Sequence, residues 1–320
     1  GNIGKELFRQ LEREQKNLEE NHQIKINVVG ITNSREMKIF DNPESDFDLN
    51  NNFNTNLQKS DLKEFINSIS SKNLPNLVFV DNTSSEDVVA EYPLLFNNNI
   101  SVVTCNKKGN SSSYEQYSKF KRLAKKNNVS FLYETNVGAG LPIIKTLNDL
   151  WISGDEILKI EAILSGTISY IFNNYVGDNT FAEVVRTAQE LGYTEPDPRD
   201  DLNGMDFSRK MLILGREIGL PLEMSNVNIK DFLPEACLKA ESIPAFYEEL
   251  EKHEPYFSSF KNEAENSGRK LRLIGVLEDG KINMNTTCNT GNGIHYRADI
   301  ASHHGREKAS QAAGCRSYAL

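Results

Sequence analysis

The residues best suited to chemistry lie in one stiff, acidic segment, 192–210, which reads GYTEPDPRDDLNGMDFSRK. Asp206 and Lys210 are four positions apart on a predicted helix, so they share one face. On a protein surface such a pair contributes only about 0.3–0.5 kcal/mol. In a crevice, the carboxylate holds the ammonium in place, and the ammonium can protonate a forming alkoxide. Glu195 could receive a substrate ammonium. The alternative reading, helix capping and dipole compensation by the aspartates, stays open.

Two further turns carry residue types that bind ions. The lysines of Asn106–Lys108 follow a predicted strand, and a lysine at the carboxyl end of a parallel strand points into the ligand crevice of such a sheet, although surface charge is the usual reading. The glycine-rich turn ETNVGAGLP, residues 134–142, could bind a cation through backbone carbonyls together with Glu134. The local sequence by itself favours a tight structural turn there.

The first residues suggest a nucleotide site. Gly1 and Gly4 open a predicted helix and resemble the end of a Gly-x-Gly-x-x-Gly turn, in which pyrophosphate approaches the backbone. The strand that should precede this turn is missing from the chain. The next predicted strand ends in Thr32–Arg35, without the carboxylate that grips the ribose of NAD. Arg35 could instead pair with a 2′-phosphate, which favours NADP(H) or mixed use.

These residues require a framework that alternates strands and helices. Up to residue 141 we predict strands over 24–34, 77–81, 100–105 and 130–135, separated by amphipathic helices. This alternation predicts a parallel, doubly wound sheet of Rossmann type, that is, an α/β nucleotide-binding domain. After Pro142 the pattern changes to helices, a strand that starts at 156 and ends before a turn at 165–167, and a hairpin around Asp279-Gly280. It predicts a second, α+β domain.

The composition of the 320 residues is that of an ordinary soluble protein, with 38% hydrophobic and 25% charged residues. A net charge of −9 with scattered lysines and arginines argues against nucleic acid as a partner. We see no apolar stretch long enough for a membrane helix and no signal peptide. Four widely spaced cysteines show no metal-type pattern. We therefore expect a cytoplasmic protein that binds small polar molecules.

Four longer stretches carry a family resemblance: VTCNKKGNSSS, ETNVGAGLPIIKTL, GDEILKIEAILSGTISYIFN and LGYTEPDPRDDLNGMDFSRKMLIL. In these motifs and in their order, residues 1–275 resemble homoserine dehydrogenase, most closely the dehydrogenase half of bifunctional aspartokinase–homoserine dehydrogenases. The resemblance implies NAD(P)H-dependent reduction of L-aspartate 4-semialdehyde to L-homoserine, a step toward threonine and methionine. It also implies a homodimer or higher homo-oligomer, with the sheet of the second domain pairing across the dimer.

The resemblance also assigns roles to residues. Lys210 matches the proton-donating lysine, Asp206 its partner and Lys107 the crevice lysine, so these three and Glu195 form the expected catalytic set. The substrate is expected to contact Glu195, Tyr193, Thr167, Asp206 and Asp201. The expected coenzyme positions are Gly1, Asn2, Ile3, Arg35, Thr83, Ser84 and Lys107. A monovalent cation, Na⁺ or K⁺, is expected at Glu134, Val137, Ala139 and Leu141, where three backbone carbonyls join one side chain.

The resemblance divides the chain into a nucleotide-binding domain (1–141), a catalytic and dimerisation domain (142–275) and a C-terminal segment (276–320). That segment departs from the family pattern, and we expect it to return to the nucleotide-binding domain. Two alternative functions remain. One is a semialdehyde dehydrogenase that uses Cys105 as a nucleophile, and the other is a catalytically inactive module of a bifunctional enzyme. The inactive module predicts loss of Glu195, Asp206 or Lys210, and all three are present.

Overall fold

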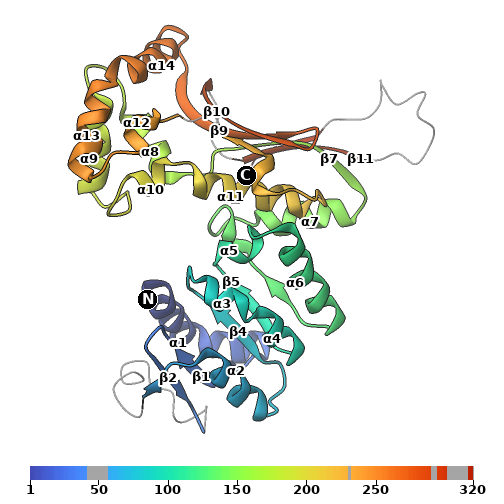
Figure 1. The fold of residues 1–320 in the computed structure, drawn as a ribbon. Helices are drawn as coiled ribbons and strands as arrows, with labels where there is room; N and C mark the ends of the chain where they lie inside the picture. Colours follow the sequence, from blue (N-terminus) through green and yellow to red (C-terminus); the bar gives the residue numbers. More distant parts are fainter. Residues whose placement is uncertain (42–56, 230–231, 290–293, 301–315, 320) are drawn as a thin grey trace. The chain divides into compact units, whose positions relative to one another are not determined.

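The computed structural model describes residues 1–41, 57–229, 232–289, 294–300 and 316–319. The chain divides into two compact units, Gly1–Tyr133 and Glu134–Leu320 (Figure 1). The division falls ahead of the boundary predicted after residue 141. The reason is local: the Glu134 carboxylate accepts hydrogen bonds from the amides of Ile144 and Lys145, at the start of a helix of the second unit.

Three short parallel strands form the centre of the first unit. Their order is β4 (Val78–Asp81), β5 (Ser101–Thr104) and β6 (Phe131–Leu132). Helices α3 (Glu86–Ala90), α4 (Tyr92–Asn97), α5 (Lys107–Asn110) and α6 (Tyr114–Lys126) connect them. Val102, Tyr92 and Phe120 are buried together where β5, α4 and α6 meet. Parallel strands joined by helices are the Rossmann-like arrangement that the sequence predicts, so the fold class is confirmed.

The beginning of the first unit differs in part from the prediction. Helix α1 (Asn2–His22) forms as expected, and α2 (Leu62–Ser71) packs beside a small antiparallel sheet of β1 (Gly30–Thr32), β2 (Glu36–Ile39) and β3 (Gln58–Lys59). Of the strand predicted over 24–34, only β1 forms, and it pairs with β2 instead of the parallel sheet. The side-chain oxygen of Asn33 accepts the amides of Arg35 and Glu36, and this turn reverses the chain directly into β2.

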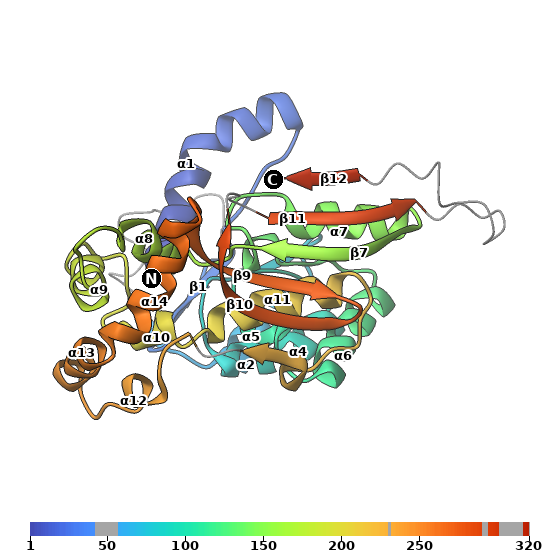
Figure 2. The same cartoon turned by 90° about the horizontal axis from the view of Figure 1, so that it is seen from above.

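A six-stranded sheet organises the second unit, in the order β12-β11-β7-β9-β10-β8. Its strands are β7 (Asp155–Ala162), β8 (Val227–Ile229), β9 (Lys270–Glu278), β10 (Lys281–Asn289), β11 (Ile294–Ile300) and β12 (Arg316–Ala319). All pairs are antiparallel except β8 with β10. The hairpin predicted around Asp279-Gly280 is confirmed as β9–β10. Figure 2 shows β7, β9, β10 and β11 side by side.

The C-terminal segment requires a correction. Residues 276–320 were expected to return to the nucleotide-binding domain, but their described strands belong to the sheet of the second unit. β10 pairs with β9, and β11 pairs with β7, because these edges offer unpaired backbone groups that a strand satisfies. Residues 290–293, 301–315 and 320 lie outside the described residues.

The helices of the second unit gather mainly at one end of the sheet (Figures 1 and 2). They are α7 (Ile143–Ile152), α8 (Gly166–Asn174), α9 (Phe181–Glu190), α10 (Arg199–Leu202), α11 (Met205–Glu217), α12 (Glu235–Leu238), α13 (Ile243–Lys252) and α14 (Glu254–Asn266). Helix α11 contacts β9 and β10. The rings of Phe181 and Phe257 stack with centroids 4.2 Å apart and join α9 to α14. Among the described residues, no helix has both the length and the apolar character needed to cross a membrane.

Candidate active site

The lysine at position 210 is held from two sides. Gly204, with φ of 73°, begins α11 and sets Asp206 on its first turn, one turn ahead of Lys210. The Lys210 Nζ lies 2.7 Å from Asp206 Oδ2 and donates over 2.7 Å to the carbonyl oxygen of Leu164. Its side chain is only 17% exposed, whereas that of Asp206 is 48% exposed. The predicted pair therefore forms, and one main-chain carbonyl that the sequence did not indicate completes the cradle.

The substrate residues predicted around Glu195 also come together. The Thr167 hydroxyl, on the first turn of α8, donates to the carbonyl of Tyr193 over 2.8 Å and lies 3.1 Å from Asp201 Oδ1. The other oxygen of Asp201 accepts the Glu195 amide at 2.7 Å. Leu164, which binds Lys210, stands three positions before Thr167, so the turn between β7 and α8 joins both groups.

Asp201 has a structural role besides its predicted contact with the substrate. Its Oδ2 accepts the Glu195 amide and its Oδ1 lies 3.1 Å from the Thr167 hydroxyl, so the side chain ties the Tyr193–Glu195 turn to α8. The Glu195 side chain is exposed. The Tyr193 ring is exposed as well and tilts over Tyr170, with ring centroids 4.5 Å apart. The arrangement leaves the Glu195 carboxylate available to a ligand.

The outer side of the loop is tied to distant helices. The side-chain amide of Gln189 donates to the carbonyl of Pro196 over 2.8 Å, and the Tyr247 hydroxyl donates to the side-chain oxygen of Gln189 over 2.8 Å. Arg199 binds the Asp197 carboxylate and the carbonyl of Ala240. Hydrogen bonding from Arg199 lowers the pKa of Asp197.

Sequence reasoning missed Gln189, Tyr247 and Ala240, since their contacts with the loop carry no local signal. For Tyr247 and Ala240 the contacts also join positions 58 and 41 residues apart.

The predicted cation turn is compact and already hydrogen-bonded. The two carboxylate oxygens of Glu134 accept the amides of Ile144 and Lys145 at 2.8 and 2.9 Å. The carbonyl of Leu141 accepts the amide of Ile143 at 2.9 Å. Val137 is buried, and Ala139 has a positive φ of 53°. Each of these oxygens keeps a second lone pair, so the hydrogen bonds that cap α7 do not by themselves exclude the predicted cation.

In the first unit, two turns at the carboxyl ends of parallel strands bring the predicted coenzyme residues together. Thr83 and Ser84 follow β4, and Lys107 follows β5, which is hydrogen-bonded to β4. Thr83 and Ser84 are exposed, whereas Lys107 is half-buried. The buried side chain of Asn106 donates to the carbonyl of Ser85 over 2.9 Å and so joins the two turns. This edge is where doubly wound sheets bind their ligands.

The other coenzyme positions lie at the start of α1 and between β1 and β2. Gly1 is the N-cap of α1 and has no side-chain cap, so Asn2 and Ile3 begin the helix with backbone amides that a phosphate can meet. A Cβ atom placed on Gly4 would lie 3.9 Å from Asn82 Nδ2, which puts this helix start beside the turn after β4. Arg35 is exposed at the tip of the β1–β2 turn.

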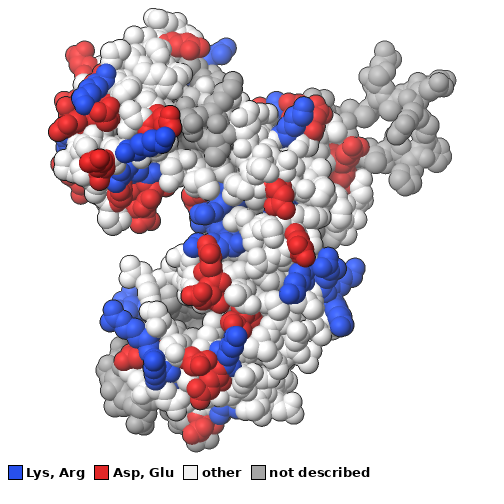
Figure 3. Space-filling view, viewed as in Figure 1, with Lys and Arg blue, Asp and Glu red and all other residues white. Residues whose placement is uncertain are grey.

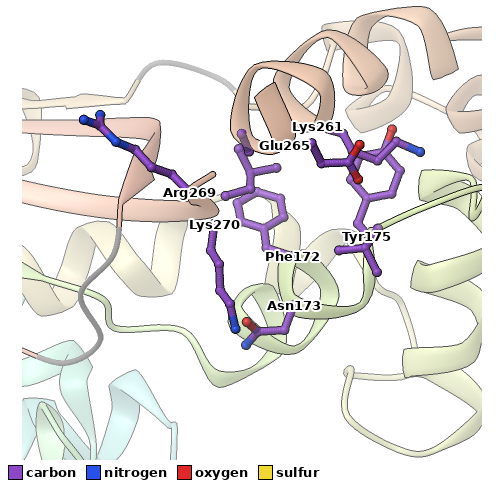
Figure 4. A pocket seen from close by; sticks show the side chains of 10 residues that line it. Phe172, Asn173, Tyr175, Lys261, Glu265, Arg269 and Lys270 are labelled. Carbon is purple, nitrogen blue, oxygen red and sulfur yellow. The ribbon is translucent and has the colours of Figure 1, made fainter. Parts of the chain in front are cut away.

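The described residues also contain a cavity that lies apart from the predicted site residues. A small cavity of about 70 Å³ in the second unit is lined by Phe172, Tyr175, Lys261, Glu265 and Lys270, among others (Figure 4), and it includes none of the predicted site residues. Acidic and basic side chains are interspersed over the face of the molecule in Figure 3. The groups of histidine, cysteine and carboxylate side chains in the described residues include no cluster that could hold a metal ion.

Comparison with known proteins identifies both halves of the chain. Residues 142–307 match the family model of homoserine dehydrogenase, and residues 1–134 match that of its NAD-binding domain. The chain is 37% identical to the homoserine dehydrogenase of Schizosaccharomyces pombe over 286 residues, 87% of this chain and 76% of that protein. It is 40% identical to the chloroplastic bifunctional aspartokinase/homoserine dehydrogenase 2 of Arabidopsis thaliana over 279 residues, 87% of this chain and 30% of that protein.

Solved structures show the same fold. A putative homoserine dehydrogenase from Archaeoglobus fulgidus superposes with a TM-score of 0.71 at 20% identity, covering 95% of this chain and 88% of that one. A mutant of a hyperthermophilic archaeal homoserine dehydrogenase in complex with NADPH gives 0.69 at 19% identity, covering 100% and 89%. The chain spans about a third of the length of the bifunctional relatives that it matches. From the matched family models and the S. pombe relative, we conclude that this chain belongs to the homoserine dehydrogenase family.

Proposed function

We propose that this chain catalyses the reduction of L-aspartate 4-semialdehyde to L-homoserine with a nicotinamide coenzyme. The observation that supports this most strongly is the cradle of Lys210, whose ammonium lies 2.7 Å from both Asp206 Oδ2 and the Leu164 carbonyl, beside the turn that carries Thr167. Family membership supplies the reaction class, and the cradle supplies a fixed proton donor for it.

The substrate is an amino acid with an aldehyde at its far end, and the proposed roles follow from that chemistry. The exposed carboxylate of Glu195 binds the substrate ammonium. Two N–H groups of Lys210 meet Asp206 and Leu164, and the third donates to the aldehyde oxygen, on which negative charge grows. Lys210 then protonates this oxygen. The carboxylate of Asp206 stabilises the charged form of Lys210, which has lost part of its hydration in the cradle. The coenzyme supplies the hydride.

For the coenzyme we propose the two polar turns after β4 and β5 and the start of α1. The backbone amides of Asn2 and Ile3 are suited to bind a pyrophosphate. Thr83, Ser84 and Lys107 lie at the carboxyl ends of the parallel strands, where such sheets bind their ligands. NADPH is bound in an archaeal homoserine dehydrogenase of the same fold. The exposed guanidinium of Arg35 is suited to a 2′-phosphate, so we propose a preference for NADPH over NADH.

A monovalent cation at Glu134, Val137, Ala139 and Leu141 remains a prediction. Its support is a compact turn whose carbonyl and carboxylate oxygens retain lone pairs. Turnover that is unchanged when K⁺ and Na⁺ are both replaced by tetramethylammonium would count against it.

One alternative is weakened by the structure. A semialdehyde dehydrogenase that forms an acyl enzyme needs a nucleophilic thiolate. Burial, followed by the nearby Asp81, raises the pKa of Cys105. Its thiol lies 3.7 Å from the carbonyl oxygen of Asp81, which holds it as a donor. Both effects favour the unreactive thiol, so we place no nucleophilic step at Cys105.

We further propose that the enzyme is a cytoplasmic homodimer acting in threonine and methionine biosynthesis, with the sheet of the second unit as the paired surface. This sheet has long antiparallel strands whose polar side chains Lys159, Glu161 and Glu278 lie together on one face. Sedimentation equilibrium of the purified chain tests the dimer, and a monomer at micromolar concentration would exclude it.

A spectrophotometric assay tests the main proposal. The purified chain is mixed with L-homoserine and NADP⁺ or NAD⁺, and coenzyme reduction is followed by absorbance. We expect turnover that requires homoserine, with the greater kcat/KM for NADP⁺. L-Serine, one methylene shorter, is the matched control substrate and should react far more slowly. Equal rates with and without homoserine would refute the proposal.

A further inference from the structure

A buried carboxylate connects the two turns assigned to the coenzyme. Asp81, the last residue of β4, is 1% exposed. One of its oxygens accepts the amide of Thr83 at 2.8 Å. The other accepts the hydroxyl of Tyr92 at 2.6 Å and the side-chain amide of Asn106 at 3.1 Å. The donors come from the turn after β4, from α4 and from the turn after β5.

The second turn is bound to the same group of residues. The side-chain amide of Asn106 also donates to the carbonyl of Ser85 over 2.9 Å, and its oxygen accepts the amide of Lys108 at 3.1 Å. The hydroxyl of Thr104 accepts the backbone amide of Asn106 at 2.8 Å and lies 3.0 Å from the Tyr92 oxygen. Thr83–Ser85 and Asn106–Lys108 therefore cannot shift relative to each other without breaking bonds to Asp81.

A purely structural reading explains this network poorly. Asp81, Tyr92, Thr104 and Asn106 are each at most 2% exposed, and burying these polar groups costs free energy that their hydrogen bonds to one another and to the backbone of the two turns must offset. A buried network that is fully hydrogen-bonded specifies one geometry. Burial, and then the adjacent Asp81, raises the pKa of Tyr92, which keeps its hydroxyl a proton donor.

We propose that Asp81 and Tyr92 are positioning residues for the nicotinamide coenzyme, which hold the Thr83–Ser84 turn and Lys107 at the spacing that the bound coenzyme requires. Neither side chain touches the coenzyme. They act through the amide of Thr83 and through Asn106, at the start of α5, which carries Lys107. This inference rests on the proposed coenzyme site.

The test compares two tyrosine hydroxyls that each donate to a carboxylate, one in the network and one in the second unit. Tyr92→Phe removes the donor to Asp81, and Tyr175→Phe removes a matched hydroxyl that donates to Glu254 over 2.7 Å in the second unit. The dissociation constant of NADPH is measured by fluorescence titration, at a temperature where circular dichroism shows both variants folded. Thr104→Val, which removes a hydroxyl from the network at nearly constant shape, serves as the second variant.

We expect Tyr92→Phe and Thr104→Val to raise the dissociation constant about tenfold and to raise the KM for coenzyme more than they lower kcat. Tyr175→Phe should change NADPH affinity less than about twofold, even if it lowers the melting temperature. Unchanged affinity in both network variants would overturn the inference, as would a wild-type chain that binds no coenzyme. Because the titration needs no turnover, a chain that binds NADPH but does not oxidise homoserine refutes only the proposed reaction.

Discussion

Replacing Lys210 by methionine keeps most of the length of the side chain and removes its ammonium. In the structure this ammonium lies 2.7 Å from both Asp206 Oδ2 and the Leu164 carbonyl, in a side chain that is 17% exposed. A water molecule in place of the ammonium would supply neither its positive charge nor its fixed position. We expect the chemical step to slow greatly and NADPH binding to persist, because the coenzyme residues are assigned to the first unit.

The size of the effect follows from what the ammonium does. Positioned proton transfer contributes about 10²–10⁴-fold, and one preorganised donor to a developing oxyanion about 10²–10³-fold. The two effects belong to one group, so they do not multiply fully, and we expect kcat to fall about 10³–10⁴-fold, or about 4–5 kcal/mol. The fold should lose only about 1–3 kcal/mol from the unpaired Leu164 carbonyl, since Asp206 is half-exposed and regains water.

The assay measures kcat for homoserine oxidation and the NADPH dissociation constant on the same preparations. Lys261→Met is the matched control. Its Nζ also donates to main-chain carbonyls, those of Gly177 at 2.8 Å and Asn179 at 3.0 Å. Lys261 is not one of the predicted site residues. We expect the control to keep kcat within about twofold. A folded Lys210→Met enzyme that retains more than about a tenth of wild-type kcat would refute the assigned role.

Two further predictions concern the loop and its braces. Asp201→Asn replaces an acceptor of the Glu195 amide and should raise the KM for homoserine about tenfold with a smaller change in kcat; steady-state kinetics would contradict this if only kcat fell. Burial raises the pKa of Tyr247 from its ordinary value of 10.0 to about 12. The folded state therefore holds this proton longer than the unfolded state, and stability is lost as pH rises through that window, by at most about 1.4 kcal/mol per pH unit. The free energy of unfolding, measured in urea between those pH values, should fall less with pH in Tyr247→Phe than in the wild type. Equal slopes of this free energy against pH in the two proteins would contradict the prediction.

The accuracy of the sequence predictions depended on how local each feature is. The Asp206–Lys210 pair could be predicted because helical spacing alone brings positions i and i+4 together. The β9–β10 hairpin could be predicted because Asp279-Gly280 specifies its turn, with both residues at positive φ. The Leu164 carbonyl that binds Lys210 comes from 46 residues away and left no local trace.

Other features were anticipated only in part, because the same residue types serve two purposes. Asp201 was assigned to the substrate, and its carboxylate also lies against the Thr167 hydroxyl and accepts the Glu195 amide. The residues after β1 suggested the end of a parallel strand, but Asn33 forms a side-chain turn that starts a hairpin. The family resemblance indicates where chemistry is expected, and long-range hydrogen bonds show what holds several of these residues in place.

Restoring the ammonium chemically tests the central claim most directly. Lys210→Cys should be as inactive as the methionine variant, and treatment with 2-bromoethylamine converts the new thiol into an aminoethyl thioether, an isostere of lysine. The natural cysteines have no part in the proposed chemistry, so wild-type enzyme treated in parallel should keep its activity. We predict that the treated variant regains turnover by at least about 10². A variant that mass spectrometry shows to be aminoethylated at position 210, yet no more active than before treatment, would contradict the account.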